Sequence, residues 1–316
     1  MEKRLVLPVI ICACAVVLVT LAYQRSRTDN STPPIYHNAS APELKRIVSL
    51  APNITEILFA LGLGSNIVAV SSDSDYPPEA LQRKKLGTFW QPNTEAVIAA
   101  EPDLVIGLAF AQQQAAARTL RRLGITVLTV KIETVAGLFG AISEIGQAAG
   151  HRQEAEQLIG AIQAELDGLV SKLGPTERPK VLWVVQPEPL RVASENTFIN
   201  EFIALAGGEN AIGSTVSQYP QVATEELLTC GAQVIIHSAM GNTDIAGQQQ
   251  RAERFWARFP LLPAVKNRRI HVVEPDALLR LGPRLGAGVE KLARCLHPQR
   301  FVSEQQAHRQ GVLSND

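Results

Sequence analysis

A stretch of sequence that occurs twice, 130 positions apart, constrains the fold of this chain more than any other feature. The first copy begins at Thr94-Glu95 and runs to the apolar segment 104–106, and the second begins at Thr224-Glu225 and runs to 234–236. In each copy a Thr that can cap a helix precedes a Glu in the first turn, a short apolar helix, a break and a β-rich run. The repeat predicts two similar α/β halves, each with one exposed Glu at a helix start.

The length and charge of the chain agree with two halves. One hydrophobic core usually organises roughly 100 to 200 residues, and this chain has 316. Thirty basic residues balance thirty acidic ones, so no overall charge would attract nucleic acid. We therefore expect no nucleic-acid partner, and any recognition by charge must be local.

The N-terminal segment 1–24 is either a signal peptide or a membrane anchor. Residues 5–22 carry no charge, and basic residues flank them on both sides. Cys14 lies in a sequence that resembles a lipoprotein cleavage site, although the apolar run continues beyond it. Residues 25–45 are polar and read as a flexible tether. The rest of the chain is expected to be periplasmic or otherwise extracytoplasmic, secreted or anchored by this segment.

Residues 46–133 are expected to form an N-terminal α/β lobe. The predicted strands are 46–50, 67–70, 104–107 and 125–130, and the predicted helices are 54–61 with Asn53 as its cap, 94–100 and 113–123. Alternation of strands and helices favours a parallel sheet.

The pattern changes over residues 134–174, where apolar residues recur at helical spacing for some forty positions. One long connecting helix is predicted there, with a kink possible at Gly150-His151. A second α/β lobe follows over 175–298, ending in a helix over 283–296, and a loose polar tail covers 299–316. The predicted fold is two Rossmann-like lobes with parallel sheets, joined by one long helix, with a ligand cleft between the lobes.

Several segments resemble the periplasmic cobalamin-binding proteins of ABC importers, which belong to the helix-hinged substrate-binding proteins. They are Ile47 to Glu56, Val70 to Glu79 with its Ser74-Asp75-Tyr76-Pro77-Pro78 block, Glu101 to Ile106, Ala206 to Asn210, Tyr219 to Val222 and Gly282 to Leu285. The resemblance covers about residues 46–298. It implies a protein that is not an enzyme, closes modestly on a corrinoid such as cobalamin (vitamin B12), and has no cofactor besides this transported ligand.

The resemblance also implies a partner for the repeated glutamates. Glu95 and Glu225 match the two docking glutamates of the family, one on each lobe, which meet arginines on the two permease subunits of an importer driven by an ATPase. Carboxylates on rigid helix starts can take bidentate guanidinium contacts, and two such contacts fix orientation. Without the resemblance, each would be read as a favourable acid in a first helical turn.

The same resemblance implies a set of ligand contacts. A corrin is a wide, largely apolar disc edged by amides, so aromatic rings and a few hydrogen-bonding groups should line its site. The matching positions are Pro52, Asp73, Phe89, Trp90, Leu108, Phe110, Tyr219, Asp276, Ala277, Leu278, Leu279 and Arg280. Asp73, Leu108, Ala277 and Leu278 stand where the family usually has aromatic residues, so the site is less aromatic than in its relatives. Asp276 and Arg280 could hydrogen-bond corrin side chains or form an ion pair, and Trp183 and Trp256 are expected in the core.

Other chemistry has little support in the sequence. The six histidines lack metal-ligand spacing, and His237 at a strand end is a lone candidate, so no metal site is predicted. No serine elbow, P-loop or dinucleotide loop occurs. Cys230 and Cys295 are either a disulfide or two buried thiols. Two alternatives remain open, namely haem or a ferric siderophore as ligand, and a membrane-tethered sensor or enzyme on the same fold.

Overall fold

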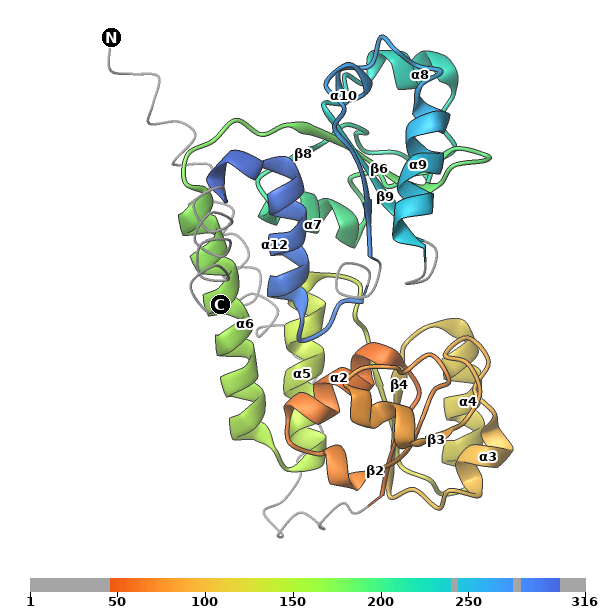
Figure 1. The fold of residues 1–316 in the computed structure, drawn as a ribbon. Helices are drawn as coiled ribbons and strands as arrows, with labels where there is room; N and C mark the ends of the chain where they lie inside the picture. The colour runs from red at the N-terminus through yellow and green to blue at the C-terminus, as the bar shows by residue number, and fades with distance from the viewer. Residues whose placement is uncertain (1–45, 240–243, 275–279, 302–316) are drawn as a thin grey trace, which may run out of the picture.

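The computed structural model describes residues 46–239, 244–274 and 280–301, which form two α/β lobes (Figure 1). The expected signal or anchor (1–24), the tether (25–45) and all of the tail beyond 301 lie outside these ranges. Within them, none of the helices is both long and apolar enough to cross a membrane.

The N-terminal lobe is built on a five-stranded sheet in the order β3-β2-β1-β4-β5. All four strand pairings are parallel, as the alternation of strands and helices predicted. The strands are β1 (Ile47–Ser49), β2 (Ile67–Val70), β3 (Lys84–Lys85), β4 (Leu104–Leu108) and β5 (Val127–Val130). The helices of this lobe are α2 (Pro52–Ala60), α3 (Thr94–Ile98), α4 (Ala111–Arg122) and α5 (Val135–Ala149), with short 3-10 turns η1 (Gly64–Asn66) and η2 (Pro78–Gln82).

The C-terminal lobe has a mixed sheet in the order β10-β9-β6-β7, with β8 also pairing with β6. Its strands are β6 (Lys180–Gln186), β7 (Arg191–Val192), β8 (Glu209–Asn210), β9 (Val234–Ser238) and β10 (Ile270–Val273). The helices are α7 (Phe198–Leu205), α8 (Thr224–Thr229), α9 (Ile245–Trp256), α10 (Pro263–Lys266) and α12 (Leu285–Leu296), followed by η3 (Pro298–Arg300). The pairings of β6 with β8 and β9, and of β9 with β10, are parallel as expected. Strand β7 departs from this expectation and is antiparallel to β6, because a short turn returns the chain directly alongside it.

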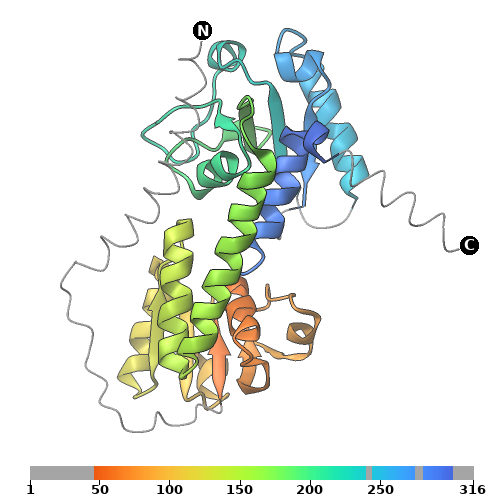
Figure 2. The ribbon, with the colours of Figure 1, turned by 90° about the vertical axis from the view of Figure 1, so that its left-hand side faces the viewer.

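The connection between the lobes differs from the single helix expected over 134–174. The chain forms α5, stops at Gly150, which has a left-handed φ of 77°, and starts again as α6 (Arg152–Leu173). Figure 1 shows α6 returning alongside α5, and Figure 2 shows it continuing into the other lobe. The predicted kink is therefore a reversal, and α6 alone is the connecting helix, 22 residues or about 33 Å long.

The repeated helix starts are capped differently from the prediction. In α3 the cap is Asn93, whose side chain accepts from the Ala96 N–H at 3.0 Å, and Thr94 is already the first helical residue. In α8 the capping position is Ala223, and Thr224 again lies inside the helix. Glu95 and Glu225 lie in the first turns of these helices, as the repeat predicted, although the threonines before them are not caps.

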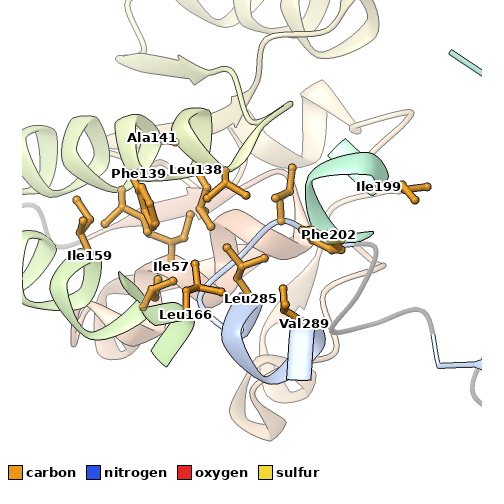
Figure 3. Close-up of a cluster of buried hydrophobic side chains, with 14 of the residues drawn as sticks. Ile57, Leu138, Phe139, Ala141, Ile159, Leu166, Ile199, Phe202, Leu285 and Val289 are labelled. Atoms are coloured by element: carbon orange, nitrogen blue, oxygen red, sulfur yellow. The ribbon is translucent and has the colours of Figure 1, made fainter. Parts of the chain in front are cut away.

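One apolar core passes through both lobes (Figure 3). It joins Ile57 of α2 and Leu138 of α5 to Leu166 of α6, and continues to Leu285 and Val289 of α12. The lobes are thus held together by shared apolar packing as well as by the chain.

The first residues of the predicted tail are also part of the folded molecule. Phe301 is fully buried, with the cationic groups of Lys172 and Arg294 over its ring at 4.3 and 4.5 Å. The prediction that the chain is loose directly after Pro298 was therefore wrong.

Candidate ligand site between the lobes

Three aromatic rings gather at the carboxyl end of the N-terminal sheet. Phe89 and Trp90 follow β3, and Phe110 lies between β4 and α4. Ring centroids are 4.7 Å apart for Phe89 and Trp90, and 5.1 Å apart for Trp90 and Phe110. Trp90 is 53% exposed, which is unusual for so large an apolar side chain outside a binding surface. The arrangement gives the lobe a partly exposed aromatic surface.

A buried glutamine that was not predicted from the sequence holds this surface in place. The Gln113 side-chain amide donates to the carbonyl oxygens of Leu50 at 2.9 Å and Phe89 at 2.8 Å, and its oxygen accepts from the Leu108 N–H. Gln113 therefore connects the ends of β1 and β4 to the loop that carries Phe89 and Trp90, called the aromatic loop below. Its only sequence signal is a polar residue on the inward face of α4, one turn before apolar Ala117 and two turns before Leu120 on that face.

Asp73 has a related role. Its Oδ2 accepts from the Phe89 N–H at 2.7 Å. Asp73, which the sequence suggested as a ligand contact, therefore holds the aromatic loop in place. Leu108 and Phe110 are half-buried around the same loop, and Pro52 is half-buried at the first position of α2. The structure thus brings Asp73, Phe89, Trp90, Leu108 and Phe110 together at the carboxyl end of the sheet.

The C-terminal lobe contains a cavity of about 1140 Å³, and all the residues that line it belong to this lobe. It lies where β6 and β9 end, between the start of α7 and one side of α9, and Figure 1 shows the carboxyl ends of β9 and β10 pointing toward the N-terminal lobe. Apolar side chains such as Phe198 and Phe255 line it together with Tyr219, the predicted aromatic contact of this lobe. Burial raises the pKa of Tyr219, so its hydroxyl stays protonated.

The predicted loop before α12 is only partly described. Asp276, Ala277, Leu278 and Leu279 lie outside the described residues. Arg280 is described, and its guanidinium pairs with both carboxylate oxygens of Asp75 in the N-terminal lobe. The sequence suggested an ion pair as the alternative role of Asp276 and Arg280, whereas among the described residues Arg280 pairs with Asp75. A contact of Arg280 with a ligand stays a prediction.

That ion pair belongs to a polar contact between the lobes that the sequence did not indicate. Arg284 donates to Glu56 of α2 twice, from Nε to Oε2 at 2.8 Å and from Nη2 to Oε1 at 2.6 Å. The Asn53 side chain donates to the Leu281 carbonyl at 3.2 Å, so Asn53 holds the other lobe and does not cap α2. The Arg284 guanidinium also lies 3.9 Å from the ring centroid of Tyr76.

A second contact joins the lobes at the start of α5. Glu201 of α7 accepts from the Val135 N–H at 2.7 Å, at the positive end of the α5 dipole. Burial raises the pKa of Glu201, and the hydrogen bond from Val135 opposes this rise. Together with Glu56 and Arg284, this contact sets how the two walls face each other.

The two candidate docking glutamates are exposed in the first turns of α3 and α8. In Figure 1 these helices lie one on each lobe, on the side away from α6. No hydrogen bond or ion pair holds the carboxylate of Glu95 or Glu225 within the described ranges.

The described part of the chain contains no group of three or more His, Cys, Asp or Glu side chains suited to a metal ion. His237 is buried and accepts a hydrogen bond from Trp256. Cys230 and Cys295 are free thiols, so the structure favours the second of the two possibilities left open for them.

Comparison with known proteins identifies the family. Residues 47–277 match the family model described as periplasmic binding protein. An ABC transporter substrate-binding lipoprotein of Bacillus subtilis, YvrC, is 32% identical over 266 residues, covering 82% of each chain. A vitamin B12-binding protein of Vibrio parahaemolyticus is 28% identical over 242 residues, covering 76% of this chain and 85% of that one.

Solved structures agree with the same architecture. The vitamin B12-binding protein BtuF of Vibrio cholerae superposes with a TM-score of 0.69 at 28% identity, over 80% of this chain and 97% of that one. The haem-binding protein HutB of Vibrio cholerae gives 0.71 at 25% identity, over 80% and 99%. The resemblance seen in the sequence is confirmed at the level of the fold and the class: this chain belongs to the periplasmic binding protein family, whose members serve ABC transporters.

Proposed function

We propose that this protein is the extracytoplasmic binding component of an ABC importer and carries a corrinoid, such as cobalamin, between its lobes. The observation that carries the proposal is the exposed ring of Trp90, packed against Phe89 and Phe110 on the N-terminal lobe, together with the largely apolar cavity of the C-terminal lobe that Tyr219 lines. Flat rings on one wall and a wide apolar cavity in the other suit a large disc-shaped ligand. The vitamin B12-binding relatives support the same ligand.

The competing ligand is haem, which the similarity to a haem-binding protein favours to the same degree. Haem bound through iron needs an axial side chain such as His or Tyr. His237 is already hydrogen-bonded through Nε2, whereas Tyr219 borders the cavity and could serve. Haem is therefore the second candidate, with Tyr219 as its only cavity-lining phenol in the described part of the chain.

Titration of the purified protein with cyanocobalamin tests the proposal. Quenching of tryptophan fluorescence should report binding, since Trp90 is exposed beside the aromatic surface and the buried Trp183 and Trp256 contact residues that line the cavity. Calorimetry on Trp90→Ala should show weaker binding, whereas Trp90→Phe, which keeps a ring, should recover most of the affinity. Leu123→Ala, at an exposed residue at the end of α4, is the control. Failure of the wild type to bind any corrinoid at micromolar concentration, or tight binding of haemin alone, would refute the proposed ligand.

The proposal includes the partners and the location. Glu95 and Glu225 would contact the two permease subunits, which carry an ATPase, and the protein would work outside the cytoplasm as its lipoprotein relative suggests. It would be a carrier with no catalytic role. The N-terminal segment 1–24 would either be removed or hold the protein at the membrane.

A further inference from the structure

Two buried tryptophans hold neighbouring side chains at the end of β9. Trp256 Nε1 donates to His237 Nε2 at 2.6 Å, and Trp183 Nε1 donates to Ser238 Oγ at 2.9 Å. Both indoles are fully buried, and they belong to different apolar clusters of the lobe, so they reach β9 from separate sides. His237 and Ser238 both line the 1140 Å³ cavity.

An indole N–H can only donate a hydrogen bond, and this fixes the polarity of both side chains. His237 Nε2 must accept, so the proton of the neutral imidazole lies on Nδ1. Ser238 Oγ also accepts, which leaves its own O–H free to donate. Burial lowers the pKa of His237 to about 4, so the ring is neutral at ordinary pH.

These two donors have no other partner among the residues that the structure describes. His237 is only 8% exposed, so an unmade bond from Nδ1 would be costly in a closed site. Both groups therefore call for an acceptor supplied from inside the cavity.

The charges around the cavity indicate which acceptor fits. Arg251, which lines the cavity, pairs with Asp244 at 3.2 Å. The lining carboxylate of Glu188 lies 3.6 Å from Arg258. Positive and negative charges are thus matched, and nothing in the described lining offers an excess cation for a carboxylate ligand. An uncharged carbonyl oxygen therefore suits the lining of this cavity better than a charged carboxylate, such as a haem propionate.

We propose that His237 Nδ1–H and Ser238 O–H form a donor pair that binds amide carbonyl oxygens at the edge of the corrinoid. This assignment rests on the proposed function and names the part of the ligand that the C-terminal lobe recognises. The same geometry prevents His237 from coordinating a metal, because Nε2 is engaged by Trp256 and Nδ1 carries the proton. His237 therefore favours a ligand whose amide groups accept hydrogen bonds over a ligand whose metal ion needs a coordinating side chain.

The tautomer is tested first, without any ligand. Nitrogen-15 NMR of the histidine side chains should show His237 protonated on Nδ1, and Trp256→Phe should shift the ring toward a mixture of tautomers. A ring protonated on Nε2 in the wild type would overturn the assignment.

Calorimetry with cyanocobalamin and haemin tests the donors themselves. Ser238→Ala and His237→Leu should each weaken cyanocobalamin binding about tenfold, the value expected for one hydrogen bond, and leave haemin binding less affected. His237→Asn places an amide N–H near the position of Nδ1 and should restore most of the loss, and Ser238→Thr should bind like the wild type. Ser214→Ala, at an exposed hydroxyl outside the cavity, is the control.

The outcomes separate this assignment from the proposed function. If the wild type binds cyanocobalamin and both Ser238→Ala and His237→Leu bind it equally well, the donor pair is wrong and the function stands. If the wild type binds haemin and no corrinoid, both are wrong. Because His237→Leu could destabilise the core, Ser238→Ala at a half-exposed residue keeps the test valid on its own.

Discussion

Glu56 and Arg284, 228 residues apart in the sequence, form a bidentate ion pair that joins the two lobes. The Glu56 side chain is 2% exposed and that of Arg284 is 25% exposed, so the pair is largely removed from water. A buried carboxylate depends on its partner, because its lost hydration must be replaced by charge and hydrogen bonds. The pair therefore fixes the orientation of the candidate site's two walls.

Removal of one member of this pair should destabilise the protein strongly. Arg284→Met leaves Glu56 buried without its main partner and should lower the free energy of unfolding by about 3 kcal/mol. The double variant Glu56→Met, Arg284→Met should recover much of this loss, since no unpaired charge remains. Urea denaturation measures both. Arg152→Ala, which breaks an exposed pair with Glu156 on α6, is the control and should change little. Equal losses in the single and double variants would contradict this account.

The Arg280–Asp75 pair should make stability depend on acid pH. Burial alone would raise the pKa of Asp75. The hydrogen bond and charge of Arg280 outweigh this effect and hold the pKa below its ordinary value of 3.8, and the Asp75 backbone and the charge of Arg284 act in the same direction. A carboxylate with a lowered pKa stabilises the fold above pH 3.8, and this contribution is lost as the pH falls through the folded pKa.

Comparison of Asp75→Asn with the wild type between pH 6 and pH 2.5 should therefore show a stability difference that shrinks below about pH 4. In an NMR titration, Arg280→Met should raise the pKa of Asp75. An unchanged Asp75 pKa in that variant would show that Arg280 does not hold the carboxylate in solution.

Glu201 should have the opposite effect. Its pKa is raised from 4.5 by burial, so the folded state binds the proton more tightly than the unfolded state, and stability falls as the pH rises through this window. Glu201→Gln keeps an oxygen for the Val135 N–H but never ionises. The stability of Glu201→Gln relative to the wild type should therefore increase from pH 4 to pH 7, as thermal unfolding at each pH would show. Glu195→Gln, at an exposed residue, is the control. A constant difference across this range would rule out the buried carboxyl as its source.

Gln113 should support ligand binding without contacting ligand. Gln113→Leu leaves the Leu50 and Phe89 carbonyls and the Leu108 N–H without this partner, which should cost about 2 kcal/mol of stability. It should also weaken cyanocobalamin binding, because the Phe89–Trp90 loop is no longer held. Gln112→Leu, at the exposed neighbouring residue, is the matched control. Chemical denaturation and calorimetry measure the two effects, and full affinity in Gln113→Leu would mean that the loop is positioned by Asp73 alone.

Charge reversal at the two helix starts should separate transport from binding. Glu95→Lys and Glu225→Lys should each reduce uptake in cells that depend on this protein, and together they should abolish it, with ligand affinity unchanged. Glu226→Lys is the matched control, since Glu226 is exposed in the same turn as Glu225 but has no counterpart in the repeat. Normal uptake by the double variant would argue against a docking role.

The elements that the sequence predicted well are those set by local patterns. Strand β2 has the predicted bounds, and β1, β4, β5 and β9 lie within a few residues of the expected ranges, because buried β-rich runs between helices carry a clear signal. The rings of Phe89, Trp90 and Phe110 pack against one another, and their role as ligand contacts stays a prediction. The reversal at Gly150 was only half foreseen, since a glycine that stops a helix does not say in which direction the chain continues.

By itself, the sequence determined the two α/β lobes, the family and the paired glutamates at two helix starts, because periodicity and motif are properties of neighbouring residues. Only the tertiary structure decided that Arg284 meets Glu56, that Gln113 holds the Phe89–Trp90 loop, and that the buried indoles of Trp256 and Trp183 donate to His237 and Ser238. Each of these contacts joins residues far apart in the chain. Their geometry depends on how the lobes and sheets pack, which no local pattern specifies.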